Sequence, residues 1–319
     1  MGGRNLLLCF DAFGTLFVPR RPIAEQYAIV ARQCGLDGLS TEQVQASFKA
    51  AFSGELRAHP NYGRASNMGA EHWWTNVIQK TFQPLVGSIR EVPKDLAPRL
   101  LHRFSSNEGY TLHPGVDTLL RSLKHHHHHH QHHHQQQHGS HRVVVGVITN
   151  SDDRVPNILS SLGLRVSPLR FGRPFNPAKV ANQHEFDIDL HCMSYDVGYA
   201  KPDKRIFDAA EGLAVQLVAA HTSNTISSTA RWLRIHVGDE YEKDVIGARA
   251  AGWHSALIGA NENVLRISGQ ESILGLDELG GRSIEEAFPK NGPPSTILSE
   301  STQKLLEWLV KLSAAELDG

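Results

Sequence analysis

A series of short apolar runs, each ending in polar residues and separated from the next by helical patterns, constrains the fold of this 319-residue chain. The runs are Leu6–Phe10, Val143–Ile148, His191–Tyr195, Arg234–Val237 and His254–Ile258. Runs of this kind are typical of strands buried on both faces of a parallel sheet, whose successive strands are joined by crossover helices. The sequence therefore predicts an α/β fold with a doubly wound parallel sheet, a Rossmann-like core.

A long stretch with helical periodicity separates the first two runs. Ile23 and Tyr27 begin an apolar face, and the segment Ser40-Thr41-Glu42-Gln43 is a candidate capping box for a further helix. We expect residues 18–111 to form a helical cap inserted into the core. The core would then comprise residues 1–17 and 112–290, and residues 291–319 would form a C-terminal helical tail.

Two segments of biased composition are expected to be insertions in the core. Residues 125–141 hold eleven of the 20 histidines, and a tract of histidine and glutamine cannot build a packed core. This composition favours a disordered loop, although clustered imidazoles also chelate metals. Residues 221–230 are rich in Ser and Thr and read as a second flexible insertion.

Composition excludes several classes of protein. With 32 Lys+Arg against 33 Asp+Glu, the chain lacks the basic excess of a non-specific nucleic-acid-binding protein. Its three cysteines, Cys9, Cys34 and Cys192, are too few and too far apart for a disulfide framework. No apolar run approaches the roughly 18 residues of a membrane-spanning helix, and no secretory signal is evident. We expect a soluble cytoplasmic protein, with the nucleus as an alternative and with no nucleic-acid or membrane partner. The oligomeric state cannot be read from the sequence.

Polar residues with chemical potential follow the strands. In an open parallel sheet, ligands bind beyond the carboxyl ends of the strands, so these residues should converge. Carboxylates there could hold a hard cation, and a lysine could neutralise an anionic substrate. The residues concerned are Asp11, Gly14 and Thr15 after the first strand, Thr149 and Asn150 after the second, Lys201 after the third, and Asp239, Glu240 and Asp244 after the fourth.

Four segments resemble, in order, the four motifs of the haloacid dehalogenase-like hydrolase superfamily: FDAFGTL, VITN, AKPD and VGDEYEKD. Each motif is weak alone, but four in order, each behind an expected strand, are specific. The resemblance covers roughly residues 5–267, and the segments HPNYGRASNMGAEHWW and KPDKRIF resemble one branch of the superfamily. It implies a hydrolase with a helical cap.

The resemblance also implies roles for individual residues. Asp11 would be the nucleophile that forms an aspartyl-phosphate, and Lys201 would hold Asp11 and the phosphate together. Thr15, Thr149 and the amide of Asn150 would bind phosphate oxygens, with Thr149 and Lys201 counted among the catalytic residues.

The same resemblance implies a magnesium site. Asp11, the backbone carbonyl of Phe13 and Asp239 would bind Mg²⁺, and Asp244 would anchor its waters or brace the loop. A small phosphorylated metabolite is the expected substrate, and its identity cannot be read from the sequence.

Phe13 departs from the phosphatase pattern. Phosphatases of this superfamily carry a second Asp at this position, and a phenyl ring cannot provide general acid–base catalysis, which is typically worth about 10²–10⁴-fold. Haloacid dehalogenases carry an aromatic residue there, but they lack the metal and have a Ser-Ser-Asn-like segment where this chain has Gly238-Asp239-Glu240. Their catalytic Arg has no firm match among Arg20, Arg21 and Arg32.

Three functions therefore remain open. The favoured function is Mg²⁺-dependent hydrolysis of a small phosphomonoester, weakened by the loss of the acid/base group. The alternatives are a feeble or inactive member that binds a phosphorylated ligand or a protein partner, and a carbon–halogen hydrolase.

Overall fold

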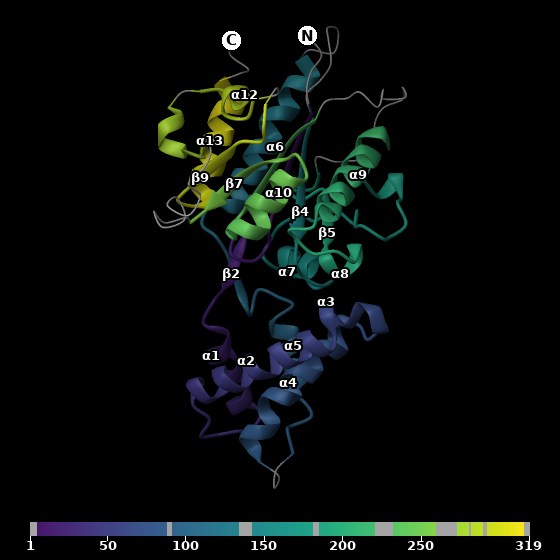
Figure 1. The fold of residues 1–319 in the computed structure, drawn as a ribbon, viewed down its shortest axis with the longest axis vertical. Coiled ribbons are helices and arrows are strands. Elements are labelled where there is room, and N and C mark those ends of the chain that lie inside the picture. The colour runs from purple at the N-terminus through teal and green to yellow at the C-terminus, as the bar shows by residue number, and fades with distance from the viewer. Residues whose placement is uncertain are drawn as a thin grey trace. The chain divides into compact units, whose positions relative to one another are not determined.

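The computed structural model describes residues 5–87, 91–133, 142–180, 185–220, 232–259, 273–280, 282–289 and 292–315, with the backbone alone at 125–133, 179 and 312–315. The chain forms two compact units (Figure 1). The core unit comprises residues 1–17, 112–150 and 163–319. The cap unit comprises residues 18–111 and 151–162.

The core unit is built on a sheet that, within the described residues, has seven strands in the order β5-β4-β1-β6-β7-β9-β8. All of its neighbouring pairs are parallel. This arrangement confirms the predicted α/β class. The strands are β1 (Asn5–Phe10), β4 (Val143–Thr149), β5 (Leu190–Met193), β6 (Trp232–Gly238), β7 (His254–Ile258), β8 (Ile273–Gly275) and β9 (Thr296–Ser299).

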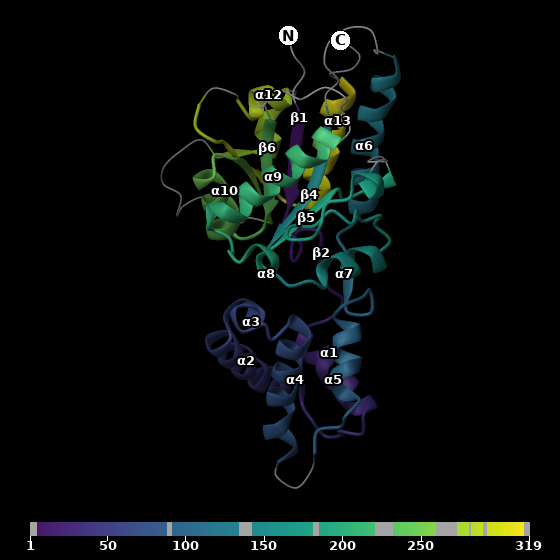
Figure 2. The same ribbon diagram turned by 90° about the vertical axis from the view of Figure 1, so that its right-hand side faces the viewer.

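Helices cover both faces of the sheet. Helices α6 (Val116–His133) and α13 (Thr302–Ala315) lie side by side on one face, and α9 (Lys204–Ala220) and α10 (Gly247–Ala250) lie on the other (Figure 2). Shorter elements connect them: η2 (Pro177–Val180), α8 (Ser194–Val197), the π-helical turn η4 (Tyr241–Ile246), η5 (Leu276–Leu279) and α12 (Ile284–Ala287).

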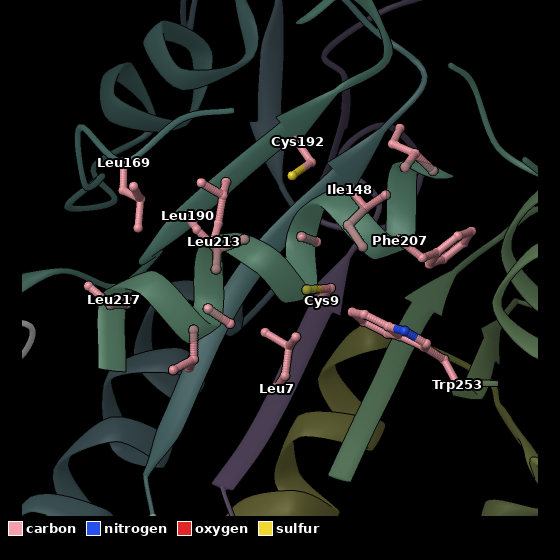
Figure 3. Packing of buried hydrophobic residues seen from close by; sticks show 14 of the residues in the cluster. Leu7, Cys9, Ile148, Leu169, Leu190, Cys192, Phe207, Leu213, Leu217 and Trp253 are labelled. Carbon is pink, nitrogen blue, oxygen red and sulfur yellow. The ribbon is translucent and has the colours of Figure 1, made fainter. Parts of the chain in front are cut away.

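The interior beneath α9 shows why the apolar runs form strands. Leu7 and Cys9 of β1 and Ile148 of β4 pack against Phe207 and Leu213 of α9, and all five are buried (Figure 3). Because both faces of these strands are covered, both sets of alternating side chains must be apolar. Asp11 follows directly after β1, which lies between β4 and β6 in the sheet.

The cap unit is helical, and the two chain segments that link it to the core unit form a two-stranded pair. Ser40 Oγ accepts a hydrogen bond from the Gln43 N–H at 3.2 Å, and Gln43 Oε1 accepts one from the Ser40 N–H at 3.1 Å, which confirms the predicted capping box. The helical elements are α1 (Ile23–Gln33), α2 (Thr41–Ala58), α3 (Pro60–Gly63), η1 (Arg64–Ser66), α4 (Ala70–Val86), α5 (Leu96–Arg103) and α7 (Val155–Ser161), and the strands that pair are β2 (Phe17–Pro19) and β3 (Tyr110–Leu112).

The segment that begins helix α7 contacts the rest of the cap unit through Trp74 of α4. Arg154 donates to both carboxylate oxygens of Asp152 at 2.8 and 2.9 Å, and the Trp74 indole N–H donates to Asp152 Oδ2 at 2.7 Å. The Arg154 guanidinium also lies 4.4 Å from the centre of the Trp74 ring. The assignment of residues 151–162 to the core is therefore wrong, because these contacts tie the segment to helix α4.

The expected C-terminal tail is also different from the structure. Residues 302–315 are helical, but β9 lies within the sheet between β7 and β8, and α13 packs on α6. The described residues 292–315 thus belong to the core, because β9 pairs with both β7 and β8.

The prediction of a disordered loop at residues 125–141 is wrong for its first part, because helix α6 continues to His133. Adding residues to an existing helix costs far less than nucleating one, and biased composition carries no information about that propagation. Residues 134–141 and the expected insertion at 221–230 lie outside the described residues. No helix in the described part of the chain is long and apolar enough to cross a membrane.

Candidate active site

The candidate site residues gather at the carboxyl edge of the core sheet. Asp11 follows β1, Thr149 ends β4, and Asp239 follows β6. Strands β4, β1 and β6 are neighbours, so their carboxyl ends meet. Lys201, in the loop before α9, reaches the same edge from beyond β5.

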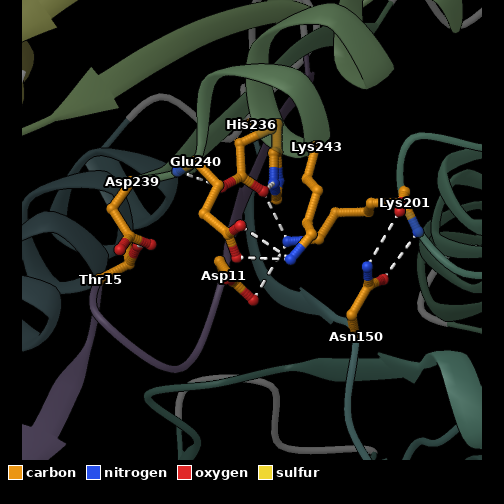
Figure 4. Close-up of polar contacts among 9 residues, drawn as sticks. Asp11, Thr15, Asn150, Lys201, His236, Asp239, Glu240 and Lys243 are labelled. Atoms are coloured by element: carbon orange, nitrogen blue, oxygen red, sulfur yellow. Dashed lines mark hydrogen bonds and ion pairs between the residues drawn. The ribbon is translucent and has the colours of Figure 1, made fainter. Parts of the chain in front are cut away.

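Lys201 connects two of the carboxylates. Its ammonium lies 3.1 Å from Asp11 Oδ1 and 2.6 Å from Asp244 Oδ1, and the residue is only 3% exposed (Figure 4). Burial alone would lower the pKa of this lysine, but the carboxylates of Asp11 and Asp244 outweigh burial and raise it. Lys201 is therefore a fixed positive charge beside Asp11.

Asp244 accepts hydrogen bonds from three donors. Besides Lys201, His236 Nε2 donates to Oδ1 at 3.0 Å and the Glu240 N–H donates to Oδ2 at 2.9 Å. Although burial opposes it, the charge of Lys201, followed by the hydrogen bond from His236, lowers the pKa of Asp244. Gly238 permits this packing, because a Cβ there would lie 2.1 Å from Asp244 Cγ. The bond from the Glu240 N–H ties Asp244 to the turn that follows β6.

Asp11, Asp239 and Asp244 form an acidic cluster. One oxygen from each carboxylate can be chosen so that all three lie within 4.8 Å of one another. Partial burial, and then the negative charges of Asp11 and Asp244, raise the pKa of Asp239. Asp11 Oδ1 is buried, and its cationic partner is the Lys201 ammonium at 3.1 Å. Mg²⁺ prefers carboxylate oxygens, and Asp239 brings a second negative charge to Asp11 without a cation of its own among the described residues, so this set of donors fits a hard divalent cation such as Mg²⁺.

The turn after β1 packs against Asp239. Gly14 has a φ of +79°, and a Cβ there would lie 2.2 Å from Asp239 Oδ2, so the turn requires glycine. The Thr15 hydroxyl donates to Asp239 Oδ1 at 3.2 Å. In the structure this hydroxyl orients the Asp239 carboxylate, whereas the resemblance implied that it binds a phosphate oxygen.

Two residues outside the motifs support the same turn. His113 Nε2 donates to the Gly14 carbonyl at 2.9 Å, and the Thr302 hydroxyl, at the start of α13, donates to the Thr15 carbonyl at 2.6 Å. Sequence reasoning missed both. Thr302 has no local signal beyond its place at a helix start, because its partner is 287 residues away.

Thr149 and Asn150 lie where the prediction placed them, at the end of β4. Thr149 is buried. The Asn150 side chain donates from Nδ2 to the Lys201 carbonyl at 2.9 Å and accepts at Oδ1 from the Lys201 N–H at 2.7 Å (Figure 4). This double hydrogen bond fixes the lysine loop, a use of the side chain that the sequence did not suggest.

Phe13 presents an aromatic ring two residues after Asp11. The ring packs edge-on against Phe17, with 4.7 Å between ring centres and 68° between planes. The position therefore contributes an apolar contact within the turn and supplies no group that could exchange a proton.

His236 is a further residue that sequence reasoning missed. It lies inside an apolar strand and contacts Asp244, so its position in the sequence suggested only a strand residue. Glu240 was named, and the structure pairs it with Lys243 at 2.7 Å on an exposed turn.

Comparisons with known proteins point to one family. A family model for haloacid dehalogenase-like hydrolases matches residues 6–215. Haloacid dehalogenase-like hydrolase domain-containing protein 3 of Bos taurus is 29% identical over 256 residues, covering 80% of this chain and 82% of the relative. An uncharacterised hydrolase of Schizosaccharomyces pombe is 27% identical over 260 residues, covering 82% of this chain and 93% of the relative.

Solved structures show the same fold. A defluorinating L-2-haloacid dehalogenase superposes with a TM-score of 0.52 at 14% identity, covering 96% of this chain and 95% of that chain. At this identity the likeness concerns the arrangement of the chain and carries no information about the reaction.

Proposed function

Because this chain belongs to the haloacid dehalogenase-like hydrolases, we propose that it is a magnesium-dependent hydrolase of small phosphomonoesters that acts through an aspartyl-phosphate on Asp11. The acidic cluster carries the proposal. Within the described residues, Lys201 pairs with both Asp11 and Asp244, while Asp239 has no cationic partner and has a raised pKa. Three carboxylates around one ammonium leave negative charge that a divalent cation would balance.

The chain's own residues account for the first chemical step. A carboxylate oxygen of Asp11 attacks phosphorus, an acyl-phosphate bond forms, and the bond from phosphorus to the ester oxygen breaks. Lys201 is placed to reduce the repulsion between the carboxylate and the anionic phosphoryl group. Asp11, Asp239 and the Phe13 carbonyl are proposed to hold Mg²⁺, which supplies charge neutralisation to the phosphoryl oxygens when it is bound.

The departing alkoxide needs a proton, and water must later attack the aspartyl-phosphate to release inorganic phosphate and restore Asp11. Phe13 can assist neither proton transfer. Solvent would then supply the proton, so we expect slow turnover and a preference for esters with good leaving groups.

Phe13 also favours a second function, the binding of a phosphorylated ligand without turnover. Loss of the acid/base group with retention of the lysine and the acidic cluster would leave a phosphate-binding site. Carbon–halogen hydrolysis is less well supported, because displacement of a halide by Asp11 needs no cation and would not explain Asp239.

Phosphate release from a panel of phosphomonoesters, including an aryl phosphate, tests the proposal with and without Mg²⁺. We expect Mg²⁺-dependent release that is lost in Asp11→Asn and retained in Asp208→Asn, a matched change on the exposed side of α9. Mass spectrometry of acid-quenched protein should detect phosphorylated Asp11.

Other results would assign the site differently. Release that persists in Asp11→Asn would remove Asp11 as nucleophile. Halide release from 2-haloacids without Mg²⁺ would establish the dehalogenase function. Binding of inorganic phosphate with no turnover of any ester would establish the binding function.

A further inference from the structure

His236 is a buried polar residue in the middle of the core sheet. It lies on β6, opposite Cys9 of β1 and Ser255 of β7, and is fully buried. Its ring packs perpendicular to that of Phe207, with 5.2 Å between ring centres. Burial, and then the positive charge of Lys201, lower the pKa of His236.

Only one nitrogen of this imidazole is used. Nε2 donates to Asp244 Oδ1 at 3.0 Å, which fixes the proton on Nε2. Nδ1 is buried and has no hydrogen-bond partner among the described residues. A buried nitrogen without a partner lowers stability, and an apolar side chain against Phe207 would avoid that cost. Packing alone therefore does not explain why a histidine occupies this position. A hydrogen-bond donor to Asp244 does explain it.

The donor completes a buried chain of contacts that ends at Asp11. His236 donates to Asp244 Oδ1, Lys201 donates to the same oxygen at 2.6 Å, and the Lys201 ammonium lies 3.1 Å from Asp11 Oδ1. The Glu240 N–H holds Asp244 Oδ2, and the imidazole holds Oδ1 beside the lysine, so the imidazole restricts rotation of the carboxylate about its Oδ2 contact. The orientation of the carboxylate in turn sets where the lysine ammonium can lie.

We infer that His236 is a positioning residue of the Asp11 site: its Nε2–H fixes the Asp244 carboxylate, which holds the Lys201 ammonium against Asp11. The effect on rate rests on the proposed function, but the effect on the position of Lys201 does not. His236 touches no reacting atom in this arrangement and acts only through Asp244.

Two substitutions separate positioning from packing. His236→Gln keeps an N–H that can reach Asp244, and His236→Phe fills the volume beside Phe207 without a donor. His236→Leu is a second apolar variant should the phenyl ring be too large. Crystal structures of the variants, obtained under one condition, report where the Lys201 ammonium lies.

We expect Lys201 to contact both Asp11 and Asp244 in wild type and in His236→Gln. In the apolar variants, Asp244 should turn and the contact between Lys201 and Asp11 should be lost. The kcat for an aryl phosphate with Mg²⁺ should fall by up to about 10²-fold in the apolar variants, the cost of misplacing a group by about 1 Å, with a much smaller change in KM. His236→Gln should recover most of that loss even where thermal unfolding shows it to be the least stable variant.

If His236 served only to fill space, the variants would rank in the opposite order of turnover. If the apolar variants keep Lys201 against Asp11 and turn over as fast as His236→Gln or faster, the inference is wrong. If wild type hydrolyses no phosphomonoester, the proposed function fails, and the position of Lys201 in the crystal structures still decides the role of His236.

Discussion

The side chain two residues after Asp11 sets the limit on the proposed reaction. Phe13 packs on Phe17 within the turn. The carboxyl group of an aspartate at position 13 would be attached to the same Cβ position as the phenyl ring. Its environment is acidic, because Asp11 and Asp239 lie at the same sheet edge. Like charges raise the pKa of a carboxyl, which favours donation of a proton and disfavours activation of water.

Phe13→Asp should increase the rate of the first step, in which the aryl alcohol is released, towards the roughly 10²–10⁴-fold range of general acid–base catalysis. Because water activation would lag, the aspartyl-phosphate should accumulate and a burst should precede the steady state. Rapid-quench measurement of aryl alcohol release checks this. Phe13→Leu, which lacks the carboxyl, should show no gain. A folded, Mg²⁺-binding Phe13→Asp that is no faster than wild type in the first turnover would show that position 13 does not face the leaving group.

Asp239→Asn should weaken Mg²⁺ binding beyond the roughly 10–100-fold typical of changes around a metal site, because it removes a charge and keeps the shape. Titration calorimetry with MgCl₂ measures the affinity, and the unfolding midpoint shows whether the fold is retained. The exposed Glu242→Gln is the matched control and should bind as wild type does. Equal Mg²⁺ affinities for Asp239→Asn and wild type would exclude Asp239 from the site.

At this scale the sequence predicted which residues meet but not how they are oriented. Asp11, Lys201 and Asp239 follow strands, and parallel topology alone brings strand ends together. The partners of these residues could not be predicted, because they depend on packing between distant segments. Thr302 lies at the start of a helix, and His236 lies inside a strand. Residues with no role in a site are common at both kinds of position, so the sequence does not single these two out.

Among the elements, α7 is the one whose attachment the sequence did not reveal. Nothing in its local sequence distinguishes a helix that covers the sheet from one that packs with the cap. The deciding contacts, Trp74 to Asp152 and Arg154 over the indole, join residues about 80 positions apart. The strand β9 was missed because four residues beside Pro294 are too few for a reliable period-2 pattern.

Asp152→Asn should destabilise the protein by about 3 kcal/mol or more at pH 7, because it leaves the buried Arg154 without its counter-charge. Despite the opposing effect of burial, the charge of Arg154 lowers the pKa of Asp152. The stabilisation is therefore present above the ordinary aspartate pKa of about 3.9 and is lost as the pH falls through the lower folded-state pKa.

Urea unfolding at pH 7 and at pH 3 or slightly below measures both effects. The difference between wild type and Asp152→Asn should shrink at the acidic pH. The neighbouring Asp153→Asn, on an exposed residue, should behave as wild type at both pH values. A difference that stays constant with pH would show that the charge of Asp152 is not what stabilises this contact.

The whole chain carries almost no net charge at neutral pH. The net charge is −1 at pH 7 with histidine neutral, and the calculated pI is about 7.1. Histidine dominates the response to acid, since the chain has 20. His191, His236 and His254 are held neutral because burial, the largest cause for each, lowers their pKa.

Solubility should therefore be lowest near pH 7 and rise towards about pH 5.5, roughly one unit below the ordinary histidine pKa. The concentration left in solution after centrifugation measures this. Replacing the ten histidines between 125 and 138 by glutamine should flatten the rise. A solubility minimum at pH 5.5 would contradict this account of the charge.

The double entry of the chain into the cap unit, at 18–111 and again at 151–162, has a consequence for how such proteins can be recombined. A cap exchanged between relatives as one uninterrupted insert would arrive without α7. The host's Asp152 and Arg154 would then face a foreign helix in place of Trp74. A working chimera must exchange both segments at four splice points, and the second segment begins directly after Asn150. Such an exchange therefore cuts the chain next to the residue whose side chain holds the Lys201 loop in place.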